Sequence, residues 1–420
     1  MKNKPAILIT AYAFNPFWGS EQGTGWNFIT NIPKDFELKV ITRSENEKHV
    51  NRFIETNKLN VSNIEFYYFD FTQNSKWNKS SFTVMAHYWI WQTRVISFIE
   101  TSNIEFDICH CLNFHTDWVP SFLFKFKKPF IWGPIGHHEK IPKIFMINYS
   151  GKQLFKDRFT WNIKKYFWKY SSALKKTASS ADFILTINTK SLPFLPRPDK
   201  RLINLSAVGS RSYLKDWTID DASEKYNNKR FEILCIARFV PLKGIDIVLG
   251  AFATFLNNTD SSEYIKLKII GKGECESLYL QIIKELNIEK YVSIIKWMPH
   301  EELDQVYRSS HVFLFPSHEG AGMVVVEALA NGLPVICLDN DGPGEIIDES
   351  CGFSIKANSY DEAINNIAIK LTLMRGNRDL CMQYSVNAFK RWSSHYSWDK
   401  KGIMLGNVYN KILNDENHDH

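Results

Sequence analysis

Two glutamates spaced eight residues apart are the residues of this chain best suited to bind an elongated polar ligand. Glu319 and Glu327 lie in the segment Pro316–Ala328, where an apolar run ends and a glycine-flanked turn opens a helix. Eight residues on a helix correspond to about 12 Å along the axis and about 80° around it, so both carboxylates can face one ligand. Valines and alanines surround Glu327, and a glutamate on a buried helix needs a polar partner. In the alternative interpretation, Glu319 only complements the helix dipole and Glu327 is solvated.

The turn between the two glutamates is suited to binding phosphate. Backbone N–H groups at the start of a helix bind anions, and small residues leave those groups accessible. The turn residues are Gly320, Ala321, Gly322 and Met323. Upstream, Arg238 and Lys243 follow the apolar run Phe231–Ile236, which would place both cations at the carboxyl edge of a parallel sheet. Taken alone, such a pair is usually surface charge, but together with the glutamates it fits a nucleoside diphosphate sugar.

Strand-like and helix-like segments alternate along the chain and predict the elements that position these residues. The expected strands are 6–10, 38–42, 64–69, 107–111, 129–132, 183–187, 231–236, 265–270, 292–296, 312–315 and 334–337. Such alternation implies parallel sheets with right-handed crossovers, and two such series imply two doubly wound α/β domains. We therefore predict domains at residues 1–210 and 229–395, with the seam between them at 197–228, where a polar stretch at 220–230 shows no apolar periodicity. Residues 396–420 are expected to form a helix that returns to the first domain, and a polar tail.

The order and spacing of the second-half motifs resemble those of the family 4 retaining glycosyltransferases. The residues that carry the resemblance are Arg238, Lys243-Gly244, Ile270-Gly271-Lys272-Gly273, Glu319, Glu327 and Asn331-Gly332-Leu333-Pro334-Val335. The match runs from about Phe231 to Ile347. The resemblance implies the GT-B architecture of two facing Rossmann-like domains, and transfer of a sugar from a nucleotide donor with retention at the anomeric carbon. Most members of the family need no metal, so we expect no cofactor.

The resemblance also implies roles for the individual residues. Arg238 and Lys243 would neutralise the diphosphate leaving group, where charge develops in the transition state. Glu327 would bind the ribose hydroxyls, and Glu319 would lie near the transferred sugar. Asp339-Asn340-Asp341 is superficially similar to the metal-binding motif of another glycosyltransferase architecture, but turn residues are the favoured interpretation.

The first half matches the same family more loosely. Gly19, in Gly19-Ser20-Glu21, corresponds to the family's glycine-rich loop and is expected to help bind the donor. The loop Trp132–Gly136 lies where many members carry a histidine facing the sugar. Among the histidines of this chain we predict that His137 is catalytic, because Gly136 before it indicates close backbone approach.

Composition and charge exclude several classes of protein. The chain has 420 residues, of which 44% are hydrophobic and 23% charged, and this excludes a largely disordered chain. A formal charge of +6 is low for a protein that binds nucleic acid, so no such partner is expected. No window offers the roughly 20 apolar residues of a membrane-spanning helix. The seven scattered cysteines, and a first strand that starts directly behind the N-terminus, favour a cytoplasmic protein.

The segment Gly151–Lys176 differs from the rest of the chain. It carries eight Lys and Arg against one acid, with seven aromatic residues interleaved. Read as a helix, this is the profile of an element that lies on an anionic membrane surface, and it would make the protein peripheral at the inner face of the cell membrane. The alternative is a solvated helix whose aromatics pack on the first domain.

Three functions remain open from the sequence. The first is a retaining glycosyltransferase that acts on a glycan or lipid-linked acceptor in bacterial polysaccharide biosynthesis, such as that of capsule or lipopolysaccharide. The second is a nucleotide-sugar epimerase or a phosphorylase with the same fold, although no supporting motif for a phosphorylase is present. The third is a non-catalytic nucleotide-sugar-binding protein, which the retention of both Glu319 and Glu327 disfavours.

Overall fold

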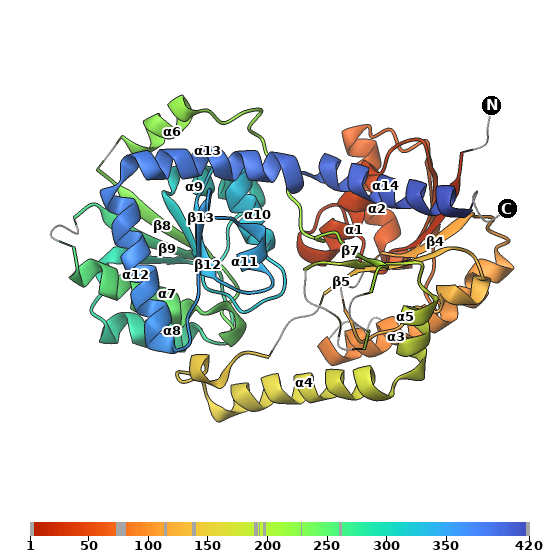
Figure 1. Ribbon diagram of the computed structural model, residues 1–420, viewed down its shortest axis with the longest axis horizontal. Coiled ribbons are helices and arrows are strands. Elements are labelled where there is room, and N and C mark those ends of the chain that lie inside the picture. Colours follow the sequence, from red (N-terminus) through yellow and green to blue (C-terminus); the bar gives the residue numbers. More distant parts are fainter. Residues whose placement is uncertain are drawn as a thin grey trace. The chain divides into compact units, whose positions relative to one another are not determined.

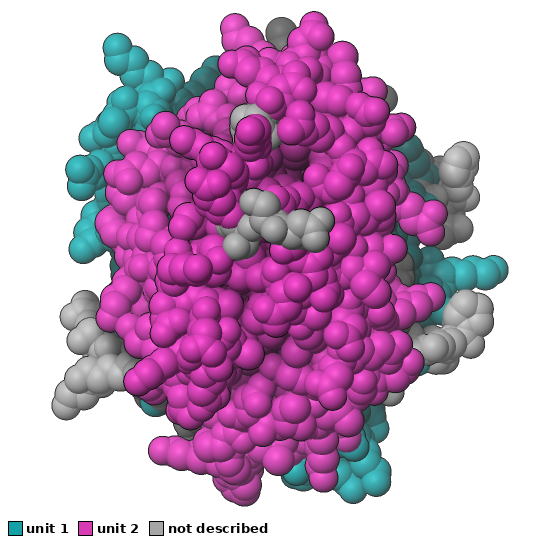
Figure 2. Space-filling view, turned by 90° about the vertical axis from the view of Figure 1, so that its left-hand side faces the viewer, with its two compact units in different colours: residues 1–137, 162–207, 398–420 teal, residues 138–161, 208–397 magenta. Residues whose placement is uncertain are grey.

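The computed structural model divides into two compact units, each built on one parallel sheet (Figure 1). It describes residues 4–72, 81–112, 116–136, 140–188, 192, 194–195, 199–227, 229–259 and 263–416. The first unit comprises Met1–His137, Asn162–Ala207 and Trp398–His420, and the second comprises His138–Trp161 and Val208–Ser397; Figure 2 distinguishes them by colour. In the described part of the chain, no helix combines the length and apolar character needed to cross a membrane.

The first unit contains a seven-stranded sheet in the order β3-β2-β1-β4-β5-β6-β7, and all pairs are parallel. Its strands are β1 (Ala6–Thr10), β2 (Glu37–Thr42), β3 (Ile64–Tyr68), β4 (Ile108–Cys111), β5 (Phe130–Ile135), β6 (Phe183–Thr186) and β7 (Leu202–Asn204). Its helices are α1 (Ser20–Asn31), α2 (Glu47–Asn57), α3 (Ser81–Thr101), α5 (Ser172–Ser180) and α14 (Trp398–Glu416). The central strands are buried along their length, as expected where helices cover both faces of a parallel sheet.

The second unit contains a six-stranded sheet in the order β10-β9-β8-β11-β12-β13, again with parallel pairs throughout. Its strands are β8 (Phe231–Ile236), β9 (Ile265–Ile270), β10 (Val292–Ile295), β11 (Val312–Phe315), β12 (Val335–Leu338) and β13 (Gly352–Ile355). Its helices are α6 (Ile219–Tyr226), α7 (Ile245–Asn257), α8 (Glu276–Glu285), α9 (His300–Ser309), α10 (Met323–Ala330), α11 (Pro343–Ile346), α12 (Tyr360–Gly376) and α13 (Arg378–His395).

Both sheets have the Rossmann strand order, which confirms the predicted α/β class with two doubly wound domains. Counted within its own unit, each sheet runs 3-2-1-4-5-6, and the first adds one further edge strand. The eleven predicted strands are all present. The two that were not predicted, β7 and β13, are short edge strands of three and four residues, whose sequences carry little apolar periodicity.

The C-terminal helix α14 belongs to the first unit, as predicted. It packs along α1, where Gly402 approaches so closely that a Cβ there would lie 1.8 Å from the backbone oxygen of Asn31. The hydroxyl of Tyr409 lies 2.7 Å from Nδ1 of His110 on β4, so a buried polar contact also holds the helix to the sheet. His110 therefore has a structural role, and its burial lowers its pKa to about 4.

The division of the chain differs from the predicted boundaries in two places. Residues 138–161, expected within the first domain, cluster with the second unit. The polar stretch 220–230, expected at the seam between the domains, begins with helix α6. A capping box between Thr218 and Asp221 starts this helix, and Ala222 and Tyr226 are buried on its inner face. Only two buried positions in eight residues are too few to reveal a helical period from sequence.

Candidate functional site

The predicted ligand-binding residues gather where the strand order of the second sheet reverses. β8 and β11 are adjacent in the sheet, and their helical connections leave in opposite directions. Arg238 and Lys243 follow β8, and Glu319 follows β11. In doubly wound sheets, ligands bind in the crevice outside the carboxyl ends of the strands at this reversal. The topology therefore brings the upstream cations and the downstream carboxylate to one place.

Glycines allow the loops at this edge to pack backbone against backbone. Gly271 has φ +152°, and a Cβ there would lie 1.9 Å from the carbonyl oxygen of Ala237. Gly244 has φ +63°, and a Cβ there would lie 2.4 Å from the oxygen of Pro316. Larger residues at either position would separate the loops. The two glycines thus hold the loop after β8 against the loops after β9 and β11.

Lys243 and Glu319 form an ion pair at this crevice. Nζ of Lys243 donates a hydrogen bond to Oε2 of Glu319, and the lysine also lies over the ring of Phe315, 5.1 Å from its centroid. Lys243 is only 9% exposed. A cation so deeply buried needs a counter-charge, which Glu319 supplies. The pair brings together two of the predicted site residues, 76 positions apart in the chain.

Arg238 lies on the same loop as Lys243 and is exposed. The loop is anchored on both sides of this residue. The N–H of Ala237 donates to the oxygen of Ile270, and that of Phe239 donates to the oxygen of Lys272, with distances of 3.0 Å each. The backbone at Arg238 is thereby fixed beside the glycine-rich loop after β9, while its guanidinium remains accessible to a ligand.

Glu327 lies on α10 and has the partner that its buried surroundings require. The hydroxyl of Tyr307, on the neighbouring helix α9, donates a hydrogen bond of 2.9 Å to Oε2 of Glu327. Tyr307 is fully buried, and this burial raises the pKa of its hydroxyl well above the usual range. Tyr307 therefore acts as a permanent donor. Sequence reasoning predicted that a partner must exist but had no signal to identify it.

The turn between Glu319 and α10 presents the start of the helix to the same edge of the sheet. Gly322 is the N-cap residue, and no side chain caps the helix there. A Cβ on Gly342, in the loop after β12, would lie 2.3 Å from the backbone oxygen of Glu319. The loop after β12 therefore packs directly against the predicted phosphate-binding turn.

Asn340, in the Asp339–Asp341 turn, bridges these two loops. Its side-chain oxygen accepts from the backbone N–H groups of Gly342 and Gly344, at 3.2 and 3.3 Å, as expected of a turn residue. Its Nδ2 in addition donates to the backbone oxygen of Ser317. The turn interpretation is therefore right but incomplete, because Asn340 also holds the segment that carries Glu319.

Residues 138–161 also contact the segments that carry Lys243 and Glu319. The ring of Phe145 packs against His318, next to Glu319, with 4.7 Å between ring centroids. The hydroxyl of Tyr149 donates to Oδ1 of Asp246, three residues beyond Lys243, at 2.5 Å. Asp246 is 1% exposed, and burial raises the pKa of its carboxyl. These contacts explain why the segment clusters with the second unit, and nothing in the local sequence could have revealed them.

The predicted residues of the first unit are only partly described. Gly19 is exposed and is the N-cap residue of α1. His137 lies outside the described residues, so its predicted role remains a prediction. Within β5, Gly133 has φ +118°, and a Cβ there would lie 2.3 Å from the oxygen of Leu185, so the backbones of β5 and β6 approach closely at that point. The close approach predicted at Gly136 stays a prediction.

A cluster of polar residues at the carboxyl ends of β1, β2 and β3 was missed. The hydroxyl of Tyr12 lies 2.9 Å from Nδ1 of His87. Arg43 lies over the ring of Tyr12 at 5.0 Å and pairs with Asp70 at 3.5 Å. Each of Tyr12, Arg43 and Asp70 follows a predicted strand within two residues. That position was the available signal, since ligands of doubly wound sheets bind at these ends.

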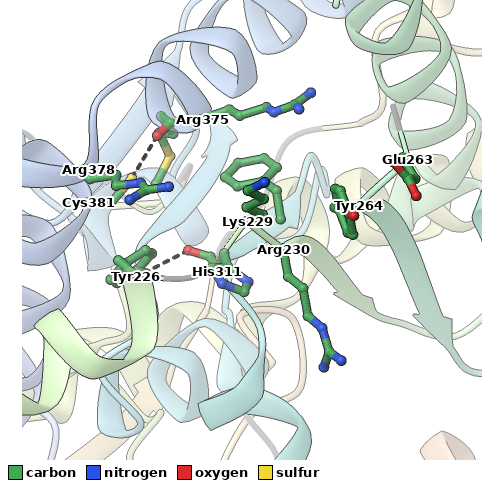
Figure 3. A pocket seen from close by; sticks show the side chains of 11 residues that line it. Tyr226, Lys229, Arg230, Glu263, Tyr264, His311, Arg375, Arg378 and Cys381 are labelled. Carbon is green, nitrogen blue, oxygen red and sulfur yellow. Dashed lines mark hydrogen bonds between the residues drawn. The ribbon is translucent and has the colours of Figure 1, made fainter. Parts of the chain in front are cut away.

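A separate cavity of about 430 Å³ lies at the opposite, amino-terminal edge of the second sheet (Figure 3). Phe231 at the start of β8 and His311 just before β11 contribute to its lining, together with Lys229, Arg230 and Arg378. It is cationic, but it lies at the other end of the strands from Lys243 and Glu319 and is not part of the candidate site.

Comparison with known proteins agrees with this geometry. Residues 217–391 match the family described as glycosyl transferases group 1. A relative in Erwinia amylovora, the amylovoran biosynthesis glycosyltransferase AmsK, is 28% identical over 171 residues, which cover 37% of this chain and 41% of the relative. The chain thus spans about two fifths of the length of that relative.

Solved structures show a similar fold over almost the whole chain. Sucrose-phosphate synthase from Thermosynechococcus elongatus has a TM-score of 0.64 at 14% identity and covers 98% of this chain and all of its own. WaaG, a glycosyltransferase involved in lipopolysaccharide biosynthesis, has a TM-score of 0.58 at 15% identity and covers 94% of this chain and 98% of its own. At these identities the likeness concerns the fold, and it confirms the expected GT-B architecture.

Proposed function

We propose that this chain, whose residues 217–391 match the group 1 glycosyl transferases, transfers a sugar from a nucleoside diphosphate donor to an acceptor hydroxyl with retention at the anomeric carbon. The bond between the anomeric carbon and the diphosphate oxygen breaks, and its electron pair leaves with the diphosphate. The acceptor oxygen forms the new bond to the same carbon on the same face of the sugar, and its proton passes to the departing diphosphate oxygen. The accumulating charge is therefore negative on the leaving group and positive on the sugar.

The observation that carries the proposal is the Lys243–Glu319 ion pair at the point where the sheet order reverses. A cation and a carboxylate side by side at this position would be suited to the opposite charges that develop during transfer. Lys243 and the exposed Arg238 would stabilise the diphosphate, and the N-terminus of α10 adds its positive pole. Glu319 would face the transferred sugar. Glu327, oriented by Tyr307, would bind the ribose hydroxyls.

We propose further that the acceptor is a glycan or a lipid-linked saccharide in bacterial polysaccharide biosynthesis. The AmsK relative acts in amylovoran biosynthesis, and WaaG acts in lipopolysaccharide biosynthesis. We propose that no metal takes part, because Arg238 and Lys243 supply the positive charge that a metal would otherwise bring. His137 keeps its predicted role beside the sugar. Recruitment to an anionic membrane surface through the basic, aromatic segment Gly151–Lys176 is a separate proposal.

A panel of nucleotide sugars tests this function. The protein is incubated with each donor, with and without saccharide acceptors, and released nucleoside diphosphate is measured. Release that requires an acceptor supports the transferase. Conversion of the donor sugar to an isomer without release would indicate an epimerase instead. Tight binding of a donor with no turnover under any condition would indicate a non-catalytic binding protein.

A further inference from the structure

The cavity at the amino-terminal edge of the second sheet has the size of a ligand site (Figure 3). Its volume of about 430 Å³ lies within the range of about 300–1,000 Å³ that is usual for small-molecule sites. The described residues that line it come from the end of α6, from the segments that lead into β8, β9 and β11, and from the junction of α12 and α13. All of them belong to the second unit, so the cavity is a feature of one folded unit.

The inner wall of this cavity is apolar. Phe231, Met374 and Cys381 are each at most 4% exposed, and the buried ring of Tyr226 lines the cavity beside them. Two hydrogen bonds hold this wall in place (Figure 3, dashed lines). The hydroxyl of Tyr226 donates to the backbone oxygen of His311 at 2.8 Å, and Sγ of Cys381 donates to that of Met374 at 3.0 Å. These contacts fix the wall independently of any ligand.

The charged residues of this cavity are mainly cationic. Among the described residues that line it, four carry a positive charge and one a negative charge, namely Lys229, Arg230, Arg375 and Arg378 against Glu263. The cations come from two segments that lie far apart in the sequence, so the fold itself brings them together. Like charges around one cavity repel each other, and this arrangement therefore costs stability unless an anion binds there.

Lys229 and Arg378 are the cations that are available to an anion. Both are exposed, and within the described part of the chain neither side chain forms an ion pair or a hydrogen bond. Other lysines at the same edge of the sheet have partners. Nζ of Lys266 donates to the backbone oxygen of Lys290 at 2.9 Å, and both lysines lie over the ring of Tyr291, at 5.8 and 4.7 Å. The unpaired cations are thus those beside the cavity.

Charge and shape together favour a phosphate ester as the ligand. A phosphorylated hydroxyl carries a charge of about −1.5 to −2 near neutral pH, which two unpaired cations can match. The planar guanidinium of Arg378 can donate two parallel hydrogen bonds to phosphate oxygens. A free phosphate ion gains nothing from an apolar wall, whereas the organic part of an ester can pack against it. The ring of Tyr264, which is 42% exposed, offers a further surface for a sugar or a base.

We propose that this cavity binds a phosphorylated small molecule, with Lys229 and Arg378 binding its phosphate and Tyr264 packing against its organic part. The cavity lies at the other end of β8 and β11 from Lys243 and Glu319, so it is separate from the proposed donor site. The proposal does not rest on the reaction proposed above. Binding can therefore be measured whether or not the protein turns over a nucleotide sugar.

The test is isothermal titration calorimetry of the full-length protein with inorganic phosphate, glucose 6-phosphate and AMP. At least one of the two esters should bind, and more tightly than inorganic phosphate; the better ester distinguishes a sugar phosphate from a nucleoside phosphate. The double variant Lys229→Gln and Arg378→Gln should lower the ester affinity at least about tenfold, because two charge-assisted hydrogen-bond donors are lost. Tyr264→Ala should lower the ester affinity about fivefold and leave the affinity for inorganic phosphate unchanged.

Matched controls separate the cavity from general positive charge and from the proposed donor site. Lys266→Gln combined with Lys290→Gln removes the same charge from the same edge of the sheet and should change the ester affinity by about twofold at most. Arg238→Gln removes an exposed cation of the proposed donor site and should also retain ester binding. Thermal melting without a probe checks that each variant is folded. Failure of both esters to bind, equally tight binding of inorganic phosphate, equal loss in the lysine control, or loss in Arg238→Gln would overturn the proposal.

Discussion

The hydroxyl of Tyr149 donates a hydrogen bond of 2.5 Å to Asp246, across 97 positions of sequence, and thereby fixes the start of α7 three residues beyond Lys243. Asn148 donates a second hydrogen bond to the same carboxyl group at 3.1 Å. Asn148 and Tyr149 lie far from the loop after β8 in the sequence, but their hydrogen bonds help to hold this loop in place.

The variant Tyr149→Phe removes the hydroxyl and should weaken this support. A hydrogen bond to a charged group contributes about 1.5–3 kcal/mol, so we expect a loss of about 2 kcal/mol in the free energy of unfolding. The KM for the donor should also rise, because Lys243 loses its fixed position. Urea denaturation and donor kinetics measure the two effects. Tyr213 is 75% exposed, so Tyr213→Phe should stay within about 0.5 kcal/mol of the wild type. Equal effects of the two variants would contradict the supporting role.

Tyr307 positions Glu327, and Tyr307→Phe should reveal this in the kinetics. Without the hydroxyl, the Glu327 carboxylate loses the donor that orients it toward the ribose. Loss of one hydrogen bond corresponds to about 1 kcal/mol, so the KM for the donor should rise about fivefold with kcat nearly unchanged. Steady-state kinetics with varied donor measures this. A fall in kcat at unchanged KM would place Tyr307 in a different role.

Buried histidines should make the fold less stable in mild acid. Burial lowers the pKa values of His87, His110, His311 and His318 to about 4 in the folded protein. Between about pH 4 and 6.5 the unfolded chain binds more protons than the folded one, so stability rises with pH across this window and is lost as pH falls. His110, which is fully buried, should alone contribute on the order of 3 kcal/mol to this dependence.

Urea denaturation at several pH values measures the slope of stability with pH. The variant His110→Gln cannot take up a proton, so its slope between about pH 4 and 6.5 should be shallower than that of the wild type. The absolute stability of the variant will also change because contacts to Tyr409 and Gly133 are altered. For this reason the slope is the relevant quantity. An unchanged slope would show that His110 does not titrate differently in the two states.

Addition of a chelator tests whether the cations replace a metal. If Arg238 and Lys243 stabilise the diphosphate, EDTA should leave the rate of transfer unchanged, while Lys243→Met should lower it by orders of magnitude. The two measurements are made with the same donor and acceptor. Activity that is lost with EDTA and restored by a divalent cation would show that these side chains do not suffice.

The sequence could predict the sheet edge at which the site lies because the strands of both domains are short, apolar and well separated by helical segments. Once β8 and β11 were located, the carboxyl-end rule placed Arg238, Lys243 and Glu319 together. The same rule applied to β1, β2 and β3 would have found Tyr12, Arg43 and Asp70.

The contacts that support the site could not be predicted in this way. Tyr307 and Glu327 meet because two helices pack side by side, and Tyr149 meets Asp246 because residues 138–161 belong to the second unit. Neither contact leaves a local pattern, since hydrogen-bond partners at long sequence separation are set by packing of whole elements.

Removing the charge of Glu327 and removing the charge of Glu319 should have different effects on the kinetics. Glu327→Gln should raise the KM for the donor roughly tenfold to a hundredfold, because a hydrogen bond to a charged group contributes about 1.5–3 kcal/mol in ground and transition states alike. Glu319 is proposed to face the sugar, where positive charge grows only during transfer, so Glu319→Gln should lower kcat.

The most direct test of the proposed site is calorimetric binding of nucleoside diphosphate to Glu319→Gln, measured beside its kcat. Removing the carboxylate frees Lys243 from its ion pair, so nucleotide affinity should be retained or increased while kcat falls. Glu327→Gln serves as the comparison and should lose affinity. If Glu319→Gln weakens nucleotide binding as much as Glu327→Gln does and leaves kcat unchanged, the proposed roles of the two glutamates are wrong.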